Sequence, residues 1–219
     1  NHIEWIITKK SFDDNPLFSE DLSLYPISSI CADHLVDSEI YIPTFLRENL
    51  SPICDIATLN NITTITIPLL EGSDMINDSI RSSFINEIRK YGLAYPHLIF
   101  SFEIESYEHV IQEILDICSN FRLTYDTGNM TSLGINHQYY LKKFFNKIDN
   151  IHLKDRTFNK ETVSPTTGDT QFNKIFNYLR SNNYNGTYTL QTAREEIGNE
   201  TQTMSKHKQI LTEIYEKSI

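Results

Sequence analysis

Two short apolar runs, each ending in polar side chains, constrain the fold more than any other part of the sequence. They are Phe121-Arg-Leu-Thr-Tyr-Asp-Thr-Gly-Asn129 and Ile151-His-Leu-Lys-Asp-Arg156, and the stretch from His137 to Lys147 between them has helical spacing. A parallel strand buried on both faces is apolar inside, so polar chemistry collects at its carboxyl end. The pattern predicts a βαβ unit with these residues at its active edge: Asp126, Asn129, His152, Lys154 and Asp155.

The same alternation of strand and helix extends over the rest of the chain. Stretches with helical spacing lie between most of the strand-like runs, which is typical of a parallel sheet with right-handed crossovers. The expected helices are Ser73–Tyr91, Tyr107–Cys118, His137–Lys147, Thr170–Ser181 and Glu195–Ser218. The expected strands, rich in Ile, Leu, Thr, Phe or Tyr, are Ile3–Ile7, Ile27–Ala32, Thr63–Leu69, Leu98–Ile104, Arg122–Asp126, Asn150–Leu153 and Thr187–Thr192.

Seven strands are one fewer than a closed (β/α)8 barrel needs. The sequence begins inside an apparent strand at Ile3, and a first strand about thirty residues upstream would complete the barrel. We therefore expect an α/β fold, a TIM barrel lacking its first strand, with residues 1–219 forming a single N-terminally truncated domain. The link from Ile7 to Ile27 is rich in Pro and Asp, so it is either an irregular crossover or lacks residues.

Composition excludes several classes of function. The formal charge of -10 and the pI of about 5.1 oppose binding to nucleic acid, whose phosphates are held by clustered Lys and Arg. The apolar runs are far shorter than the roughly 20 residues that span a bilayer, so no membrane association is expected. Cys31, Cys54 and Cys118 are widely separated, which favours neither a disulfide framework nor a zinc knuckle. A cytoplasmic protein is expected, and a homo-oligomer is left open.

Four of the late strands end in residues that can bind a metal ion. In a barrel these ends meet at one edge, where active sites are built. Two carboxylates, an imidazole and an amide oxygen form a mixed oxygen and nitrogen set suited to Mn²⁺, Mg²⁺ or Co²⁺. Each residue alone also has a structural interpretation, such as a helix cap for the aspartate, but their coincidence favours a site. The candidate ligands are Glu103, Asp126, His152 and Gln191.

Other polar residues at the strand ends offer acid/base chemistry or substrate binding. Lys154 and Arg194 are either solvated charges at the rim or groups that bind a phosphate or carboxylate of the substrate. His34 follows Ile-Cys-Ala-Asp at the end of a strand. It could act as an acid or base near neutral pH, or it could cap the loop that follows.

The motifs at the strand ends resemble those of the xylose isomerase-like TIM-barrel superfamily. This group contains the sugar phosphate isomerase/epimerase family (AP endonuclease 2-like), tagatose epimerases, inosose dehydratases and endonuclease IV. The resemblance implies a divalent metal ion (Mn, Mg, Co or Zn) held by Glu103, Asp126, His152 and residue 191. The matching segments are Phe102-Glu103, Asp126-Thr-Gly-Asn129, His152-Leu-Lys-Asp155 and Asn183-Tyr-Asn-Gly186 followed by Leu190-Gln191.

Three positions depart from the pattern of the superfamily. Gln191 stands where most catalytic members place Glu, Asn129 stands where many have His, and the loop Val163–Gly168 lacks the usual Leu-Gly-x-Gly. Epimerases of this type use two carboxylates, one on each face of the substrate carbon. With Gln191 the second of these bases is missing, because an amide oxygen can bind a metal but is not a useful base.

The resemblance implies a metal-dependent isomerase or epimerase that acts on a small sugar or sugar phosphate through an enediolate. Glu103, His34 or Lys154 would move the proton, and the substrate would contact Asn129, Lys154, Asp155 and Arg194. A metal-dependent dehydratase of the same superfamily and a binding protein that has lost its activity are the alternatives. An abasic-DNA hydrolase is disfavoured, since it needs a three-zinc cluster with more His ligands than this sequence supplies.

Overall fold

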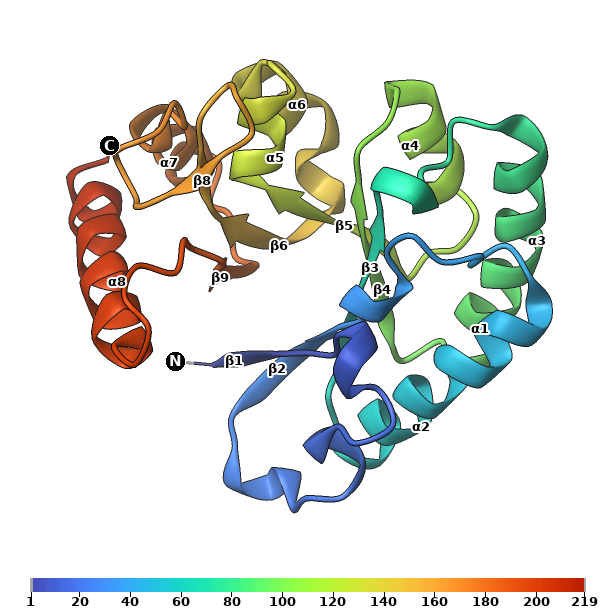
Figure 1. Cartoon of the computed structure of the whole chain (residues 1–219). Coiled ribbons are helices and arrows are strands. Elements are labelled where there is room, and N and C mark those ends of the chain that lie inside the picture. The colour runs from blue at the N-terminus through green and yellow to red at the C-terminus, as the bar shows by residue number, and fades with distance from the viewer. Residues whose placement is uncertain (1, 219) are drawn as a thin grey trace. The chain divides into compact units, whose positions relative to one another are not determined.

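The structure, a computed structural model, describes residues 2–218 and contains a seven-stranded sheet in the order β1-β2-β3-β4-β5-β6-β9 (Figure 1). The pairs β1–β2, β2–β3, β3–β4, β4–β5 and β6–β9 are parallel. All seven strands were predicted from the sequence. Their bounds are β1 Ile3–Ile6, β2 Ile27–Cys31, β3 Thr64–Leu69, β4 Ile99–Ile104, β5 Phe121–Asp126, β6 Ile148–Leu153 and β9 Thr187–Leu190.

Helices connect most of these strands, as the alternating pattern predicted. Three of the helices were not predicted: α1, α2 and α5. The link from Ile7 to Ile27 is the irregular crossover, made of the short 3-10 turns η1 Lys9–Ser11, η2 Pro16–Phe18 and η3 Leu22–Leu24. The α-helices are α1 Pro43–Asn49, α2 Ser51–Leu59, α3 Asp78–Ala94, α4 Glu108–Leu115, α5 Thr127–Ser132, α6 His137–Phe144, α7 Phe172–Ser181 and α8 Glu200–Lys217.

Helix α3 begins later than predicted. Its N-cap is Asn77, whose Oδ1 accepts the backbone N–H groups of Ser79 and Ile80 at 3.0 and 3.2 Å. Ser73, the first residue of the predicted helix, lies before α3, where its hydroxyl donates to the carbonyl of Leu35 at 2.8 Å and accepts the N–H of Ser38 at 3.0 Å. Residues 71–73 instead form a separate 3-10 turn, η5.

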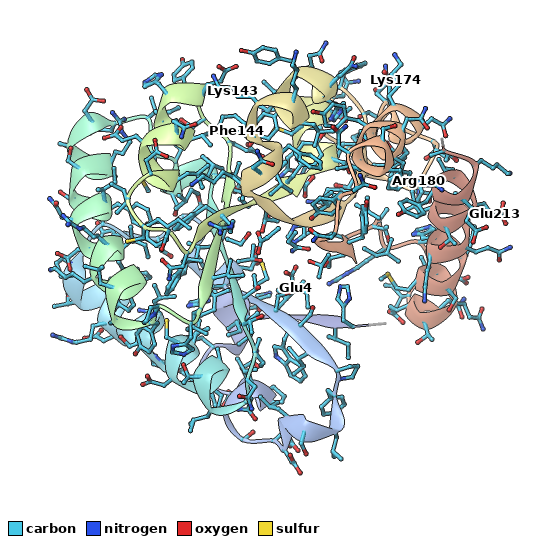
Figure 2. The ribbon with its side chains drawn as sticks, turned by 180° about the vertical axis from the view of Figure 1, so that it is seen from behind. Glu4, Lys143, Phe144, Lys174, Arg180 and Glu213 are labelled. Carbon is cyan, nitrogen blue, oxygen red and sulfur yellow. The ribbon has the colours of Figure 1, made fainter. Side chains whose placement is uncertain are left out.

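The chain divides into two compact units, Asn1–Thr124 and Tyr125–Ile219. In the first unit α3 covers the apolar face of the strands, where Phe84, Phe102 and Phe121 pack edge to face with ring centroids 6.2 and 5.0 Å apart. In the second unit Arg180 of α7 donates to the carbonyls of Tyr215 and Glu216 at 2.6 and 3.1 Å (Figure 2). It thereby caps the end of α8. The expectation of a single domain stays a prediction.

The other face of the strands in the first unit is polar. Glu4, labelled in Figure 2, accepts hydrogen bonds from the hydroxyls of Ser29 and Thr66 at 2.8 and 3.1 Å. The hydroxyls of Ser101 and Thr124 lie 2.7 Å apart on the same face. Glu103 follows Ser101 by two residues, and side chains two apart on a strand share a face. This face therefore leads to the candidate ligand. In residues 2–218 no helix is both long and apolar enough to cross a membrane.

A buried arginine links helices α3 and α4 of the first unit, and its loss should lower stability. Arg81 of α3 contacts Asp78 and Glu113 at 2.7 and 2.8 Å and donates to the carbonyl of Met75 at 2.9 Å. We expect Arg81→Ala to lower the free energy of unfolding by about 2 kcal/mol, because a buried carbonyl loses its donor. Urea unfolding measures this.

The matched control is Arg47→Ala, since Arg47 and Glu48 form an exposed pair at 3.9 Å. Its effect should stay within about 0.5 kcal/mol of the parent. Equal losses for the two variants would contradict the role given to Arg81.

Candidate metal centre

Asp126 ends β5 and begins α5, and each of its carboxylate oxygens has a partner. Oδ1 accepts the backbone N–H of Asn129 at 2.8 Å, so Asp126 is the N-cap that starts this short helix. Oδ2 lies 2.8 Å from Nζ of Lys154, whose side chain is 12% exposed. Because Asp126 is itself 1% exposed, this ion pair compensates a buried charge.

The Asp-Thr-Gly motif fixes Lys154 beside this carboxylate. The Thr127 hydroxyl donates to the carbonyl of Lys154 at 2.7 Å and accepts its N–H at 3.0 Å, which joins the end of β5 to the end of β6. At Gly128 a Cβ atom would lie 2.8 Å from the Lys154 side chain. Only glycine lets that side chain pass along the start of α5. Neither Thr127 nor Gly128 was predicted to be a site residue, although the Asp-Thr-Gly motif contains both.

His152 and Gln191 lie on one face of the β6–β9 pair. His152 is fully buried and aligns with Thr189, and its Nδ1 is 4.0 Å from Oδ2 of Asp126. Asn150, two residues before His152, accepts the Thr189 hydroxyl at 3.1 Å on the same face. Gln191 follows Thr189 by two residues, so its side chain shares this face. Its Oε1 is buried without a hydrogen-bond partner among the residues described.

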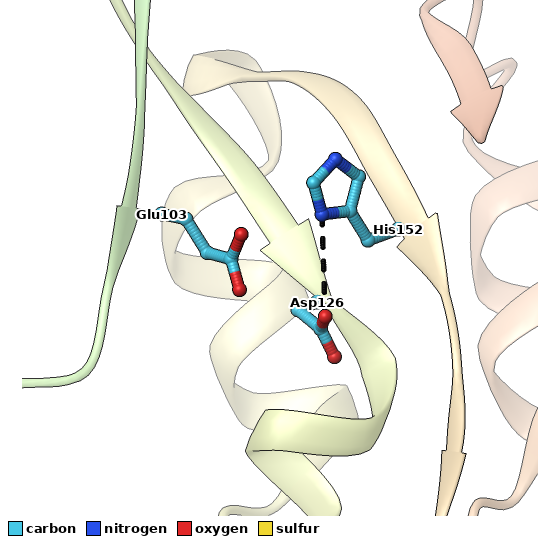
Figure 3. A group of neighbouring side chains, drawn as sticks. All are labelled: Glu103, Asp126 and His152. Atoms are coloured by element: carbon cyan, nitrogen blue, oxygen red, sulfur yellow. Dashed lines mark ion pairs between the residues drawn. The ribbon is translucent and has the colours of Figure 1, made fainter. Parts of the chain in front are cut away.

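Glu103 of β4 is the third candidate ligand beside Asp126 and His152, and it offers a carboxylate. It is 6% exposed. One ligand atom from each of Glu103, Asp126 and His152 can be chosen so that all lie within 4.8 Å of one another (Figure 3). The structure thus brings together three of the four predicted ligands. The amide oxygen of Gln191 is buried, and its place among these ligands stays a prediction.

The donor set fits a divalent cation. Two carboxylates and an imidazole are ligands for Mn²⁺, Co²⁺ or Zn²⁺, and a further neutral oxygen is compatible with each. The orphaned Oε1 of Gln191 fits the same interpretation, since buried polar atoms rarely lack a partner. The ammonium of Lys154 opposes a cation at Asp126, so this site must balance two positive charges.

Asp155 shapes the loop that follows the site. It is fully buried, and its two oxygens accept the N–H groups of Gly168 and Thr170 at 3.0 and 3.1 Å. The loop opens with a small antiparallel hairpin, β7 Asp155–Arg156 and β8 Thr162–Val163, which sequence analysis did not anticipate. Asp155 therefore holds a loop, and its predicted contact with substrate stays a prediction.

The remaining predicted site residues have different surroundings. His34 is buried against Phe12, with ring centroids 4.7 Å apart, and its Nε2 lies 3.3 Å from the carbonyl of Asn49. Burial lowers the pKa of His34 to about 4, so the ring is neutral near pH 7. Arg194 is exposed in the segment between β9 and α8. Acid/base action by His34 and anion binding by Arg194 stay predictions.

Comparisons with known proteins identify the fold. The sequence matches no family model, and no curated protein matches it either. A xylose isomerase domain protein from Planctomyces limnophilus matches with a TM-score of 0.69 at 18% identity, over 88% of this chain and 78% of that chain. The 3-keto-D-glucoside 4-epimerase YcjR from E. coli, in its apo form, matches with a TM-score of 0.66 at 13% identity, over 96% and 89% of the two chains.

A third solved structure is that of the IolI protein with a binding zinc atom. It matches with a TM-score of 0.65 at 12% identity, over 99% of each chain. At such identities the likeness concerns the fold alone. The chain therefore has the fold of the xylose isomerase-like TIM-barrel proteins, with seven parallel strands and the helices that connect them.

Proposed function

We propose that this protein is a metal-dependent isomerase or epimerase of a small sugar or sugar phosphate. The observation that carries the proposal is the convergence of Glu103, Asp126 and His152 at strand ends. The fold supports it, because solved proteins with this fold include a sugar epimerase and a protein that binds zinc. Fold alone does not define a reaction, so the residues of the site must supply the mechanism.

The residues divide the work as follows. Glu103, Asp126 and His152 would hold the ion, with Gln191 as a neutral oxygen donor. When bound, a divalent cation polarises the carbonyl of a sugar and makes the adjacent C–H more acidic. Lys154 is poised to donate a hydrogen bond to a substrate oxygen, because its ammonium is held at Asp126. Glu103 is the carboxylate that we assign to remove the proton from the substrate carbon, giving an enediolate.

Gln191 favours a second candidate, a sugar-binding protein without catalysis. A glutamine cannot exchange a proton with the opposite face of the substrate carbon.

If Glu103 is the one base of the site, proton transfer would be confined to a single face of the substrate carbon. That suits isomerisation or dehydration better than epimerisation. A protein that only binds the sugar would keep the metal centre and lose exchange altogether.

The first prediction tests the metal centre. We expect the parent to bind one Mn²⁺ or Zn²⁺ per chain, and Asp126→Asn to weaken binding by at least about tenfold, because a charged ligand is lost. Isothermal calorimetry on protein freed of metal measures both affinities. Asp116→Asn is the control, since Asp116 lies on the surface and accepts the Gln112 side chain. Equal affinities of Asp126→Asn and the parent would remove Asp126 from the centre.

The second prediction tests position 191. We expect Gln191→Glu to tighten Mn²⁺ binding by about tenfold or more, because a third carboxylate adds attraction to the cation. Gln209→Glu makes the same change of charge on the outside of α8 and should leave the affinity unchanged. If the two variants bind Mn²⁺ equally, Gln191 does not contact the ion.

The third prediction tests catalysis. Incubated in D₂O with ketoses and their phosphates, the metal-loaded parent should exchange deuterium at the carbon next to the carbonyl of one of them. Glu103→Gln should slow this exchange by about 10²–10⁴, the typical contribution of a general base. NMR measures the exchange, with Asp116→Asn as the control. Metal binding without exchange for any sugar in the panel would favour the binding protein.

A further inference from the structure

A buried histidine outside the proposed metal centre holds the segment that carries Gln191. His207 of α8 is fully buried. Its Nδ1 lies 2.8 Å from the Thr192 hydroxyl, and its Nε2 lies 3.0 Å from Oε1 of Glu195. One imidazole therefore contacts both ends of the segment 192–195, directly after Gln191.

Glu195 joins the segment 192–195 to a second segment, which contains Ser164. Its carboxylate accepts the Ser164 hydroxyl at 2.6 Å and contacts the Lys206 ammonium at 3.0 Å. The hydrogen bonds from Ser164, His207 and Lys206, in that order, lower the pKa of Glu195 to about 2. The group is thus an ionised acceptor near neutral pH.

The charge of Glu195 fixes the tautomer of His207. A carboxylate can only accept, so Nε2 of the imidazole must carry the proton that faces it. In the neutral ring Nδ1 is then an acceptor, and the Thr192 hydroxyl donates to it. The same hydroxyl lies 3.7 Å from the Met204 sulfur, which is a weaker acceptor.

The hydrogen bonds connect three parts of the second unit. Ser164 belongs to the loop that Asp155 holds through Gly168 and Thr170. The segment 192–195 lies between β9 and α8 and includes Arg194, while His207 belongs to α8. We call Ser164, Thr192, Glu195 and His207 the clamp. Directly before it, the N–H of Gln191 donates to the carbonyl of Leu153 at 3.1 Å.

We propose that His207 is a positioning residue that acts through Thr192 and Glu195 to hold Gln191 on the face of His152. Because Gln191 follows β9 directly, the direction in which the chain leaves the strand decides whether its amide oxygen stays buried. The effect on metal binding rests on the proposed function. The role of the clamp in holding the segment 192–195 does not rest on the proposed function.

Hydrogen exchange tests this role of the clamp without any ligand. In His207→Ala the amides of residues 191–199 and 157–169 should exchange about tenfold to a hundredfold faster, because hydrogen bonds to a charged group are lost. His207→Gln keeps an N–H donor and should restore part of the protection. Lys206→Ala is the matched control, since Lys206 contacts the same carboxylate from the surface and should leave exchange near that of the parent.

A second variant, Ser164→Ala, keeps the proposal testable if His207→Ala does not fold. If His207→Ala does not fold, Ser164→Ala removes only the link between the two segments and should speed exchange in residues 157–169. The ring ¹⁵N shifts of the parent should also report a proton on Nε2. Unchanged exchange in a folded His207→Ala, or in Ser164→Ala where that variant replaces it, would overturn the proposal. A proton on Nδ1 alone would overturn it as well.

A double-mutant cycle tests the link to Gln191. If His207 positions residue 191, the gain in Mn²⁺ affinity from Gln191→Glu should fall at least about threefold in the His207→Ala background and by less in the His207→Gln background, which keeps an N–H donor. A packing role alone would leave that gain unchanged and would overturn the positioning role. If the parent binds no Mn²⁺, the metal centre is wrong, and hydrogen exchange alone then decides whether the clamp exists.

Discussion

The interaction on which the site depends is the pairing of Asp126 with Lys154 and with the first turn of α5. A buried carboxylate without partners is costly. Here one oxygen accepts the N–H of Asn129 and the other meets an ammonium at 2.8 Å. Those partners define where β5 ends, where α5 begins and how the end of β6 lies beside them. The Thr127 hydroxyl and the missing side chain of Gly128 complete the arrangement.

Polar pairing also explains how hydroxyls and carboxylates are tolerated inside the sheet. Glu4 is satisfied by Ser29 and Thr66 in the first unit, and Asn150 by Thr187 and Thr189 in the second. Networks in which each member has a partner avoid the penalty of burial and rigidify their surroundings. The strands can therefore present polar side chains on the face that leads to the candidate ligands while their other face packs against helices.

Sequence reasoning succeeded where one local pattern decides the outcome. The seven strands are apolar runs, and Asp126 and His152 stand at the ends of two of them. It failed for elements whose existence depends on caps or on contacts with residues far away in the sequence. Helices α1 and α2 are short and start near Pro43 and Pro52, and α5 depends on its cap at Asp126. The two-residue strands β7 and β8 form only because they pair with each other, and strands this short leave no recognisable pattern in the sequence.

The same limit applies to single residues. His207 is fifteen positions from Thr192 and twelve from Glu195, and nothing in the spacing indicates that one ring contacts both. The role of Asp155 likewise depends on Gly168, where a Cβ would lie 2.4 Å from the carboxylate. Position 191, by contrast, could be assigned to its strand end because strand order and residue parity suffice.

Charge balance gives the glutamine at position 191 a chemical consequence. In the proposed centre two carboxylates, Glu103 and Asp126, face a divalent cation and the ammonium of Lys154, which leaves one positive charge in excess. A glutamate at 191 would neutralise it. A buried site with an uncompensated positive charge binds a neutral sugar no better but stabilises an anion. The enediolate formed by proton removal is such an anion, and so is a sugar phosphate. In the proposed function, Gln191 would supply no base on one face of the substrate and would leave the site with a stronger attraction for negative charge. The missing base is what favours one-base chemistry over the two-base exchange of an epimerase.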